Sequence, residues 1–317
     1  MDETVLARRP PEPDWSALTK EALVTYREAE NRFRASPEAR PFTGTPDPGA
    51  AIVWQQLALP GRELPVRVYR PTESRDAPEA GLPLVMHVHG GGFVGTAAQS
   101  DWVNSHLAAH LPAVVVSVEH RLLDPDTPLS AAADDGWDSF QRLLEDAAQW
   151  NIDPERTVLF GESCGALICA LTAIRAKSSG LRLRGQVLVN PVAEVTSTAL
   201  DYDSTAAYGD SPSLNLPTLR ALLRLAVPKG ADPRAVSPLH AADLRSQAPA
   251  LVLVPTHDPL ADHGRTYAAR LREAGTDVRL TEFPEAPHGF LSTPGLAPQA
   301  QEARTEVLGF IRDRLAE

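Results

Sequence analysis

Three short segments, in a fixed order along the chain, constrain the fold and the chemistry of this protein most strongly. Residues 89–93 read His-Gly-Gly-Gly-Phe, residues 161–165 read Gly-Glu-Ser-Cys-Gly, and Asp258 precedes a His-Gly-Phe run at residues 288–290. A serine in G-x-S-x-G spacing is typical of a nucleophile at a sharp turn between a strand and a helix. The order glycine-rich turn, serine, acid, histidine therefore makes acyl transfer to a serine the leading hypothesis.

Each of the first two segments follows an apolar run with the length of a strand. Residues 84–88 and 157–160 are such runs, and a glycine-rich segment follows each of them at once. Apolar runs that end at glycine are typical of buried parallel strands. The apolar stretch at residues 166–174 has the length of a helix. We therefore predict that Ser163 lies at a strand-to-helix turn, where the start of the helix offers free N–H groups and the positive end of its dipole.

Strands and helices alternate along most of the chain. We expect strands at residues 52–59, 64–69, 84–89, 114–119, 157–161, 186–190, 251–254 and 278–283, the first two as an antiparallel pair joined at Pro60-Gly61. We expect helices at residues 97–111, 130–149, 164–176, 263–274 and 298–315. This alternation predicts an α/β fold with a mostly parallel central sheet and helices on both of its faces.

Two segments do not fit the alternation and predict a separate layer. Residues 14–35 have the apolar period of a helix that starts near Asp14, and residues 195–237 are rich in Pro, Ser and Asp around a helical piece. We interpret these segments as a helical cap over one catalytic domain. The predicted boundaries are residues 1–50 for the N-terminal cap region, 195–237 for the cap insertion, and 51–194 with 238–317 for the catalytic domain.

The charge balance and the cysteines exclude some classes of protein. The formal net charge of −11 disfavours nucleic acid and anionic membranes as partners. Cys164 and Cys169 lie on different faces of one predicted helix, so no disulfide is expected and a reducing compartment fits. The first residues lack the pattern of a signal peptide, and no apolar stretch reaches membrane-spanning length. We therefore expect a cytoplasmic protein.

Ser163 is the expected nucleophile, and its hydroxyl needs a base that removes the proton. We expect His288 to be that base and Asp258 to be the acid that orients it, because both follow predicted strands and loops gather at the carboxyl ends of a parallel sheet. The order serine, acid, histidine is that of the α/β-hydrolase arrangement, and differs from those of chymotrypsin and subtilisin. Asp262 is an alternative acid, although a residue there typically binds free N–H groups at the start of a helix.

The motifs together resemble those of the bacterial hormone-sensitive-lipase-like esterases, within the α/β-hydrolase superfamily. They are His-Gly-Gly-Gly-Phe with Gly95, Gly-Glu-Ser-Cys-Gly, His-Asp-Pro-Leu-x-Asp at residues 257–262, His-Gly-Phe, and Glu-His-Arg-Leu at residues 119–122. Several positions depart from the family pattern: Glu162 replaces Asp, Cys164 replaces Ala, and His120 replaces Tyr. These departures bear on substrate range more than on reaction type.

The resemblance also implies an oxyanion hole. Backbone N–H groups of Gly91, Gly92 and Cys164 would bind the developing negative charge, since glycine lets the backbone approach a substrate oxygen closely. Phe93 would line an apolar acyl pocket together with the cap. A catalytic thiol at Cys164 is an alternative, but in such a turn the residue after the serine contributes its N–H and not its side chain.

Possible metal ligands occur in two places, the His87-x-His89 pair and the group His257, Asp258, Asp262 and His263. The pair has no third ligand near it in sequence, and the group is better explained by the acid of a triad and a helix start. We therefore expect no metal and no cofactor.

The leading hypothesis is a serine carboxylic-ester hydrolase that acts on small to medium acyl esters through an acyl-serine intermediate. One alternative keeps the same triad in an acyltransferase, a lactonising enzyme or a dehydratase of a biosynthetic pathway. Another is a ligand-binding protein on an inactive hydrolase scaffold, which the complete set Ser163, Asp258 and His288 disfavours. The expected partner is a small-molecule ester, and a homodimer is left open.

Overall fold

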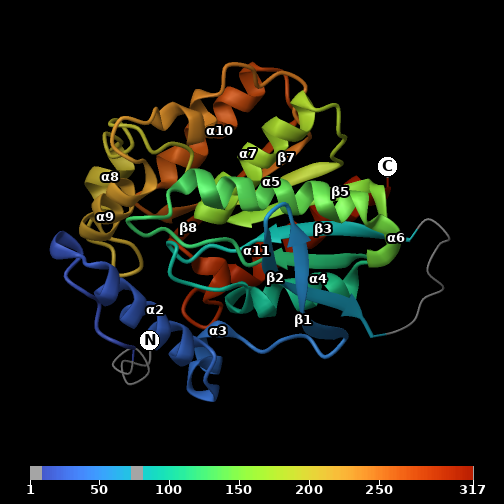
Figure 1. The fold of residues 1–317 in the computed structure, drawn as a ribbon, viewed down its shortest axis with the longest axis horizontal. Coiled ribbons are helices and arrows are strands. Elements are labelled where there is room, and N and C mark those ends of the chain that lie inside the picture. The colour runs from blue at the N-terminus through green and yellow to red at the C-terminus, as the bar shows by residue number, and fades with distance from the viewer. Residues whose placement is uncertain (1–8, 73–80, 317) are drawn as a thin grey trace.

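The computed structural model describes residues 9–72 and 81–316, in which one eight-stranded sheet forms the centre (Figure 1). The strands are β1 (Ala50–Leu59), β2 (Arg62–Pro71), β3 (Leu82–Val88), β4 (Val114–Val118), β5 (Ile152–Glu162), β6 (Gly185–Val189), β7 (Ala250–His257) and β8 (Val278–Pro287). Their order in the sheet is β1-β2-β4-β3-β5-β6-β7-β8. Strand β2 pairs antiparallel with β1 and β4, and the remaining pairs are parallel, which confirms the predicted sheet.

Helices cover both faces of this sheet. They are α4 (Asp101–His110), α5 (Leu129–Glu145), α6 (Ala147–Trp150), α7 (Cys164–Ser178), α10 (Ala261–Glu273) and α11 (Gln299–Ala316). Alternate residues of each strand point to opposite faces. Met86 accordingly packs in the core under α5, α7 and α10, whereas its neighbour Val85 packs in the core under α4 and α11. The α/β fold class predicted from the alternation is thus confirmed.

The segments that interrupted the alternation form helices at one end of the molecule, on the left in Figure 1. These helices are α2 (Lys20–Arg34), α3 (Arg40–Thr43), α8 (Asp203–Tyr208) and α9 (Leu216–Ala226). Trp15, Tyr26 and Ala221 pack together in a small apolar cluster that joins the N-terminal segment to α9.

The predicted start of the first helix near Asp14 was wrong. The Asp14 side chain accepts the N–H of Ser16 and caps only a single 3₁₀ turn, Trp15–Ala17. Thr19 then accepts the N–H of Ala22 and caps α2, which begins at Lys20. Two capping residues in succession divide the segment, and the apolar period does not reveal such a break.

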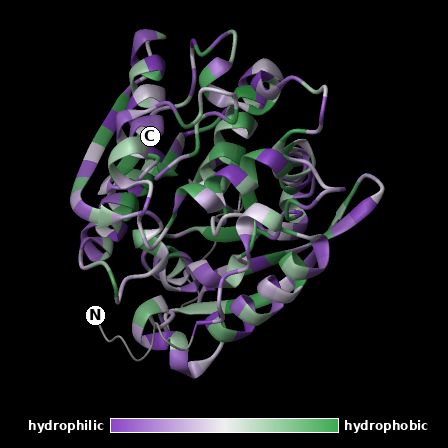
Figure 2. Ribbon diagram, turned by 90° about the vertical axis from the view of Figure 1, so that its left-hand side faces the viewer, coloured by the Kyte–Doolittle hydropathy of each residue, from purple (hydrophilic) through white to green (hydrophobic). Residues whose placement is uncertain are grey.

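Hydrophobic residues gather along the central strands and the inner faces of the helices, as Figure 2 shows in green. In the described ranges, none of the helices combines the length and the apolar character needed to cross a membrane. Residues that directly follow β3, β5 and β7 line one cavity together with residues of the N-terminal segment and of residues 195–237. The three segments identified in the sequence follow strands at this end of the sheet.

Candidate active site

Ser163 lies at the sharp turn between β5 and α7. Its backbone has φ 55° and ψ −120°, a strained combination for a residue with a side chain. The positions two residues before and two residues after the serine have no room for a side chain. A Cβ on Gly161 would lie 2.5 Å from the carbonyl oxygen of Gly165, and a Cβ on Gly165 would lie 2.1 Å from that of Val88. Positions 161 and 165 must therefore be glycine for the turn that carries Ser163 to form.

Ser163, His288 and Asp258 form one hydrogen-bonded chain. Ser163 Oγ lies 2.8 Å from His288 Nε2, and His288 Nδ1 lies 2.8 Å from Asp258 Oδ2. The Asp258 carboxylate is fully buried, and its second oxygen accepts the backbone N–H of Leu260 at 2.8 Å. Both oxygens of this carboxylate are therefore held in place, which fixes the orientation of the imidazole.

The surroundings of His288 favour its charged form. Burial by itself lowers the pKa of this histidine, but the negative charge of Asp258, the hydrogen bond to it and the charge of Glu162 together outweigh burial and raise the pKa above its usual value. The imidazole can therefore take up a proton from Ser163 and be stabilised as an imidazolium by the buried carboxylate.

The glycine-rich turn follows β3 and lies beside the serine. Gly91 has φ +93° and Gly92 has φ +59°, both in the region that favours glycine. The N–H of Val94 donates to Gly91 O at 2.9 Å, which closes the turn. Phe93 lies in the same turn, where its ring packs edge-on against His120 with the centroids 5.7 Å apart.

Cys164 is the first residue of α7. Burial raises the pKa of its thiol to about 11, although the backbone N–H groups of Phe93 and Gly92 act in the opposite direction. The side chain is therefore a neutral thiol at neutral pH, which is a poor nucleophile. Cys169 is buried deeper in the same helix, and both cysteines are free.

Sequence reasoning missed two further contacts around the serine. The carboxylate of Glu162 accepts a hydrogen bond from Ser292 Oγ, which links the serine turn to the segment after His288. Burial raises the pKa of Glu162, and its Oε1 is buried without a hydrogen-bond partner among the described residues. Asn190 Nδ2 lies 3.4 Å from His288 Nε2. The only signal in the sequence was that Glu162 stands where the family usually has Asp.

The other polar residues singled out from the sequence have structural partners. Asp262 was expected to bind backbone N–H groups at the start of its own helix; its carboxylate instead accepts the N–H of Ser204 in α8 and a guanidinium N–H of Arg265, both at 2.8 Å. His263 contacts the N–H of Ala193 and the carbonyl of Ala199. The structure thus brings Asp258, and not Asp262, to His288.

A cavity of about 370 Å³ opens above Ser163. Its wall combines the glycine-rich turn, the serine turn and apolar side chains from the N-terminal segment and the insertion; the latter include Trp15, Leu219, Leu222 and Leu223. Phe93 also lines it, as expected from the sequence. A cavity of this size and character suits a small or medium apolar ligand with one polar end.

Residues 85–292 match the alpha/beta hydrolase fold family. The chain belongs to the α/β-hydrolase family. This hydrolase is 32% identical to a carboxylesterase of Mycobacterium tuberculosis, an alignment that covers 99% of both chains. It is also 32% identical to an ethyl acetate hydrolase of Pseudomonas putida, over 80% of each chain. These matches confirm the resemblance to hormone-sensitive-lipase-like esterases that the motifs indicated.

A solved structure shares the same fold. The ester hydrolase from the metagenome of Lake Arreo superposes on this hydrolase with a TM-score of 0.86 at 27% identity, covering 100% of this chain and 97% of the other. The whole of the hydrolase, including the segments outside the sheet, therefore has counterparts in a relative that hydrolyses esters.

Proposed function

We propose that this protein is a serine carboxylic-ester hydrolase that acts on small to medium acyl esters through an acyl-serine intermediate. The observation that carries the proposal is the hydrogen-bonded chain from Ser163 through His288 to Asp258 at the floor of an apolar cavity. The similarity to a carboxylesterase and to an ethyl acetate hydrolase supports the same reaction and a short acyl group.

In this mechanism His288 Nε2 takes the proton of Ser163 Oγ as the oxygen attacks the ester carbonyl. Asp258 stabilises the imidazolium and does not itself take up the proton. The tetrahedral intermediate then collapses, and His288 returns the proton to the departing alcohol. A water molecule, activated by the same histidine, attacks the acyl-serine and releases the acid.

The negative oxygen of the intermediate would be bound by backbone N–H groups of Gly91, Gly92 and Cys164. The first two belong to the turn after β3, and the third lies at the start of α7, where the helix dipole favours negative charge. One such donor is typically worth about 3 kcal/mol of transition-state stabilisation. This assignment gives Cys164 a role through its backbone, which fits its neutral thiol.

We also propose that residues 1–50 and 195–237 form a cap over a catalytic domain of residues 51–194 and 238–317. Residues 1–8 lie outside the described residues. The apolar contact of Trp15 and Tyr26 with Ala221 supports a single cap built from both segments, and Trp15 lines the cavity. The cap and Phe93 would then set the size of the acyl group. A cytoplasmic location and a homodimer stay predictions.

Acyl transfer and elimination on the same residues are not favoured, because the relatives are named for ester hydrolysis.

A panel of chromogenic acyl esters, from acetate to decanoate, tests the proposal with wild type and Ser163→Ala. Ser178→Ala, an exposed serine at the end of α7, is the matched control. We expect hydrolysis of the shorter esters by wild type and the control, and a loss on the order of 10⁵–10⁶-fold in kcat for Ser163→Ala. Equal turnover by Ser163→Ala and wild type would contradict the nucleophile.

A further inference from the structure

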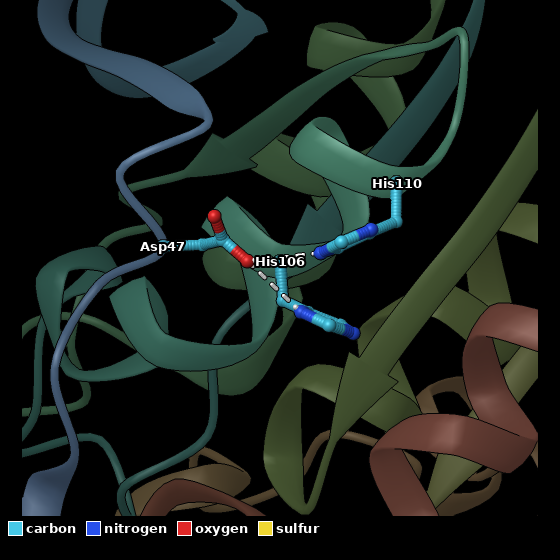
Figure 3. Close-up of side chains that lie close together, drawn as sticks. All are labelled: Asp47, His106 and His110. Atoms are coloured by element: carbon cyan, nitrogen blue, oxygen red, sulfur yellow. Dashed lines mark hydrogen bonds and ion pairs between the residues drawn. The ribbon is translucent and has the colours of Figure 1, made fainter.

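A second cluster of titratable side chains lies outside the cavity, where the segment between α3 and β1 passes over α4. Figure 3 shows Asp47 of that segment facing His106 and His110, which lie one turn apart on α4. His106 Nδ1 and His110 Nε2 each lie 3.1 Å from the same atom, Asp47 Oδ2. Within residues 9–72 and 81–316, this is the one group of three or more His, Cys, Asp or Glu side chains whose possible ligand atoms converge within 4.8 Å.

We propose that Asp47, His106 and His110 bind a divalent transition-metal ion, with Zn²⁺ as the best fit. Two imidazoles and one carboxylate are a ligand set that zinc takes in proteins. Ligand atoms about 2.0–2.2 Å from a tetrahedral Zn²⁺ lie about 3.3–3.6 Å from one another. The observed separations of 3.1 Å from Asp47 Oδ2 to both imidazoles are within a few tenths of an ångström of that spacing.

The carboxylate is held in place before any ion binds. Asp47 Oδ1 accepts the N–H of Gly49 at 2.9 Å, which leaves Oδ2 directed at the two imidazoles. The backbone N–H of Asp47 donates to Ser105 Oγ at 2.8 Å, so the residue next to His106 anchors the segment to α4. Contacts of this kind orient metal ligands and raise affinity.

The exposure of the three side chains provides an entry path. The side chain of His110 is 49% exposed, whereas those of His106 and Asp47 are 17% and 20% exposed. An ion can therefore arrive from solvent beside His110 and meet two ligands that are already fixed. The fourth position of a tetrahedral site would be taken by water.

The charges around the cluster favour zinc over magnesium or calcium. The cluster offers two imidazole nitrogens and a single carboxylate oxygen as ligand atoms. The charge of Arg304 acts on Asp47, and its guanidinium is held over the ring of Trp102, 3.8 Å from the centroid. One carboxylate beside a cation is a poor site for ions that need several oxygens, whereas two imidazole nitrogens suit zinc.

A bound ion would cross-link the chain leading into β1 to helix α4. Because it binds the folded state, the ion would stabilise the protein in proportion to its affinity and concentration. The site is separate from the proposed esterase site, so failure of one assignment leaves the other untouched.

The test is a zinc titration of protein without an affinity tag, in competition with a chromogenic chelator, and a measurement of Tm with and without Zn²⁺. The variants are His110→Ala, which changes a half-exposed side chain, and Asp47→Asn, which keeps the shape and loses the charge. His240→Ala removes another histidine beside a carboxylate, that of Glu194, and is the matched control. We expect wild type and His240→Ala each to bind one more Zn²⁺ ion than His110→Ala and Asp47→Asn do. Added Zn²⁺ should raise the Tm of wild type and His240→Ala by several degrees, and should leave the Tm of the other two proteins unchanged.

A spectroscopic measurement on the same proteins separates a built site from scattered surface binding. Co²⁺ in place of Zn²⁺ should give wild type the intense visible absorption of a tetrahedral site, and His110→Ala should lose it. Mg²⁺ should shift the Tm of none of them. Equal zinc stoichiometry and equal Tm shifts in all four proteins, or an unchanged cobalt spectrum in His110→Ala, would overturn the proposal.

Discussion

His288 Nδ1 lies 2.8 Å from Asp258 Oδ2, inside a site where the carboxylate is fully buried. Burial lowers the pKa of the imidazole, and the charge of Asp258, the hydrogen bond to it and the charge of Glu162 together raise it by more. The net pKa is therefore above the ordinary histidine value of 6.5. This single contact links the geometry of the site to the pH at which it works.

The acid limb of kcat/KM should report this histidine. His288 must be neutral to accept a proton, so activity should rise with pH through a midpoint above 6.5. Asp258→Asn removes the charge and leaves the burial, so its midpoint should move to lower pH while kcat falls on the order of 10⁴-fold. Asp262→Asn is the control and should leave the midpoint in place. If Asp262→Asn shifted the midpoint and Asp258→Asn did not, Asp262 would be the acid of the triad.

The two glycines of the proposed oxyanion hole should respond unequally to alanine. A Cβ on Gly91 would lie 2.7 Å from Gln99 Oε1 and 3.1 Å from the backbone of Gly95, whereas a Cβ on Gly92 would meet only Leu222, at 3.6 Å. Gly91→Ala should therefore displace the turn and lower kcat by about 10²–10³-fold, with a smaller loss in Gly92→Ala. Steady-state kinetics on one short acyl ester measure both. A greater loss in Gly92→Ala would contradict this account.

Cys164→Ala tests whether the thiol itself takes part in the reaction. The proposed role belongs to the N–H, which alanine retains, and the thiol is neutral because burial raises its pKa to about 11. We expect kcat within about tenfold of wild type and a stability loss of about 1 kcal/mol for the small cavity that is left. Activity as low as that of Ser163→Ala would instead assign chemistry to the sulfur.

Trp15→Ala should loosen the proposed cap. Trp15 is buried, packs edge-on against Tyr26 with the centroids 5.7 Å apart, and accepts a hydrogen bond at its carbonyl from Arg224 of α9. Loss of the indole removes part of the cavity wall, so KM for the longer acyl esters should rise several-fold while kcat stays near that of wild type. Trp54→Ala is the control, because Trp54 is 47% exposed on β1. Equal KM values in both variants would argue against cap contact with the substrate.

Asp135→Ala should destabilise the fold clearly more than the loss of an exposed acidic side chain beside it. Asp135 is fully buried and accepts hydrogen bonds from Arg62 Nε and Arg121 Nη2, both at 2.8 Å. Removing it takes the carboxylate partner from Arg121 and leaves Arg62 paired with Asp138, which should cost about 2–3 kcal/mol in the free energy of unfolding. The neighbour Asp134 is 51% exposed and pairs with Arg175 alone, so Asp134→Ala should cost at most about 1 kcal/mol. Urea unfolding of both variants gives the comparison.

The sheet and the meeting of Ser163 with His288 could be predicted because both depend on local signals. The apolar runs at β3, β5 and β7, and the glycine-rich segments that follow the first two, are properties of neighbouring residues. In a parallel sheet the carboxyl ends of all such strands lie together, so two residues 125 positions apart meet without any further information.

Contacts between side chains of different layers could not be predicted in the same way. Glu162 and Ser292, or Asp47 and His106, meet because of the path of a loop and the rotation of a helix about its axis, which neither apolar period nor motif encodes. The same holds for Trp15, which packs in one cluster with Ala221 of α9 and lines the cavity. The sequence alone thus determined the fold and the expected catalytic residues at the base of the cavity, because these follow from local periodicity and from the positions of strand ends. The tertiary structure alone decided the cavity wall and the histidine cluster, because these depend on long-range packing.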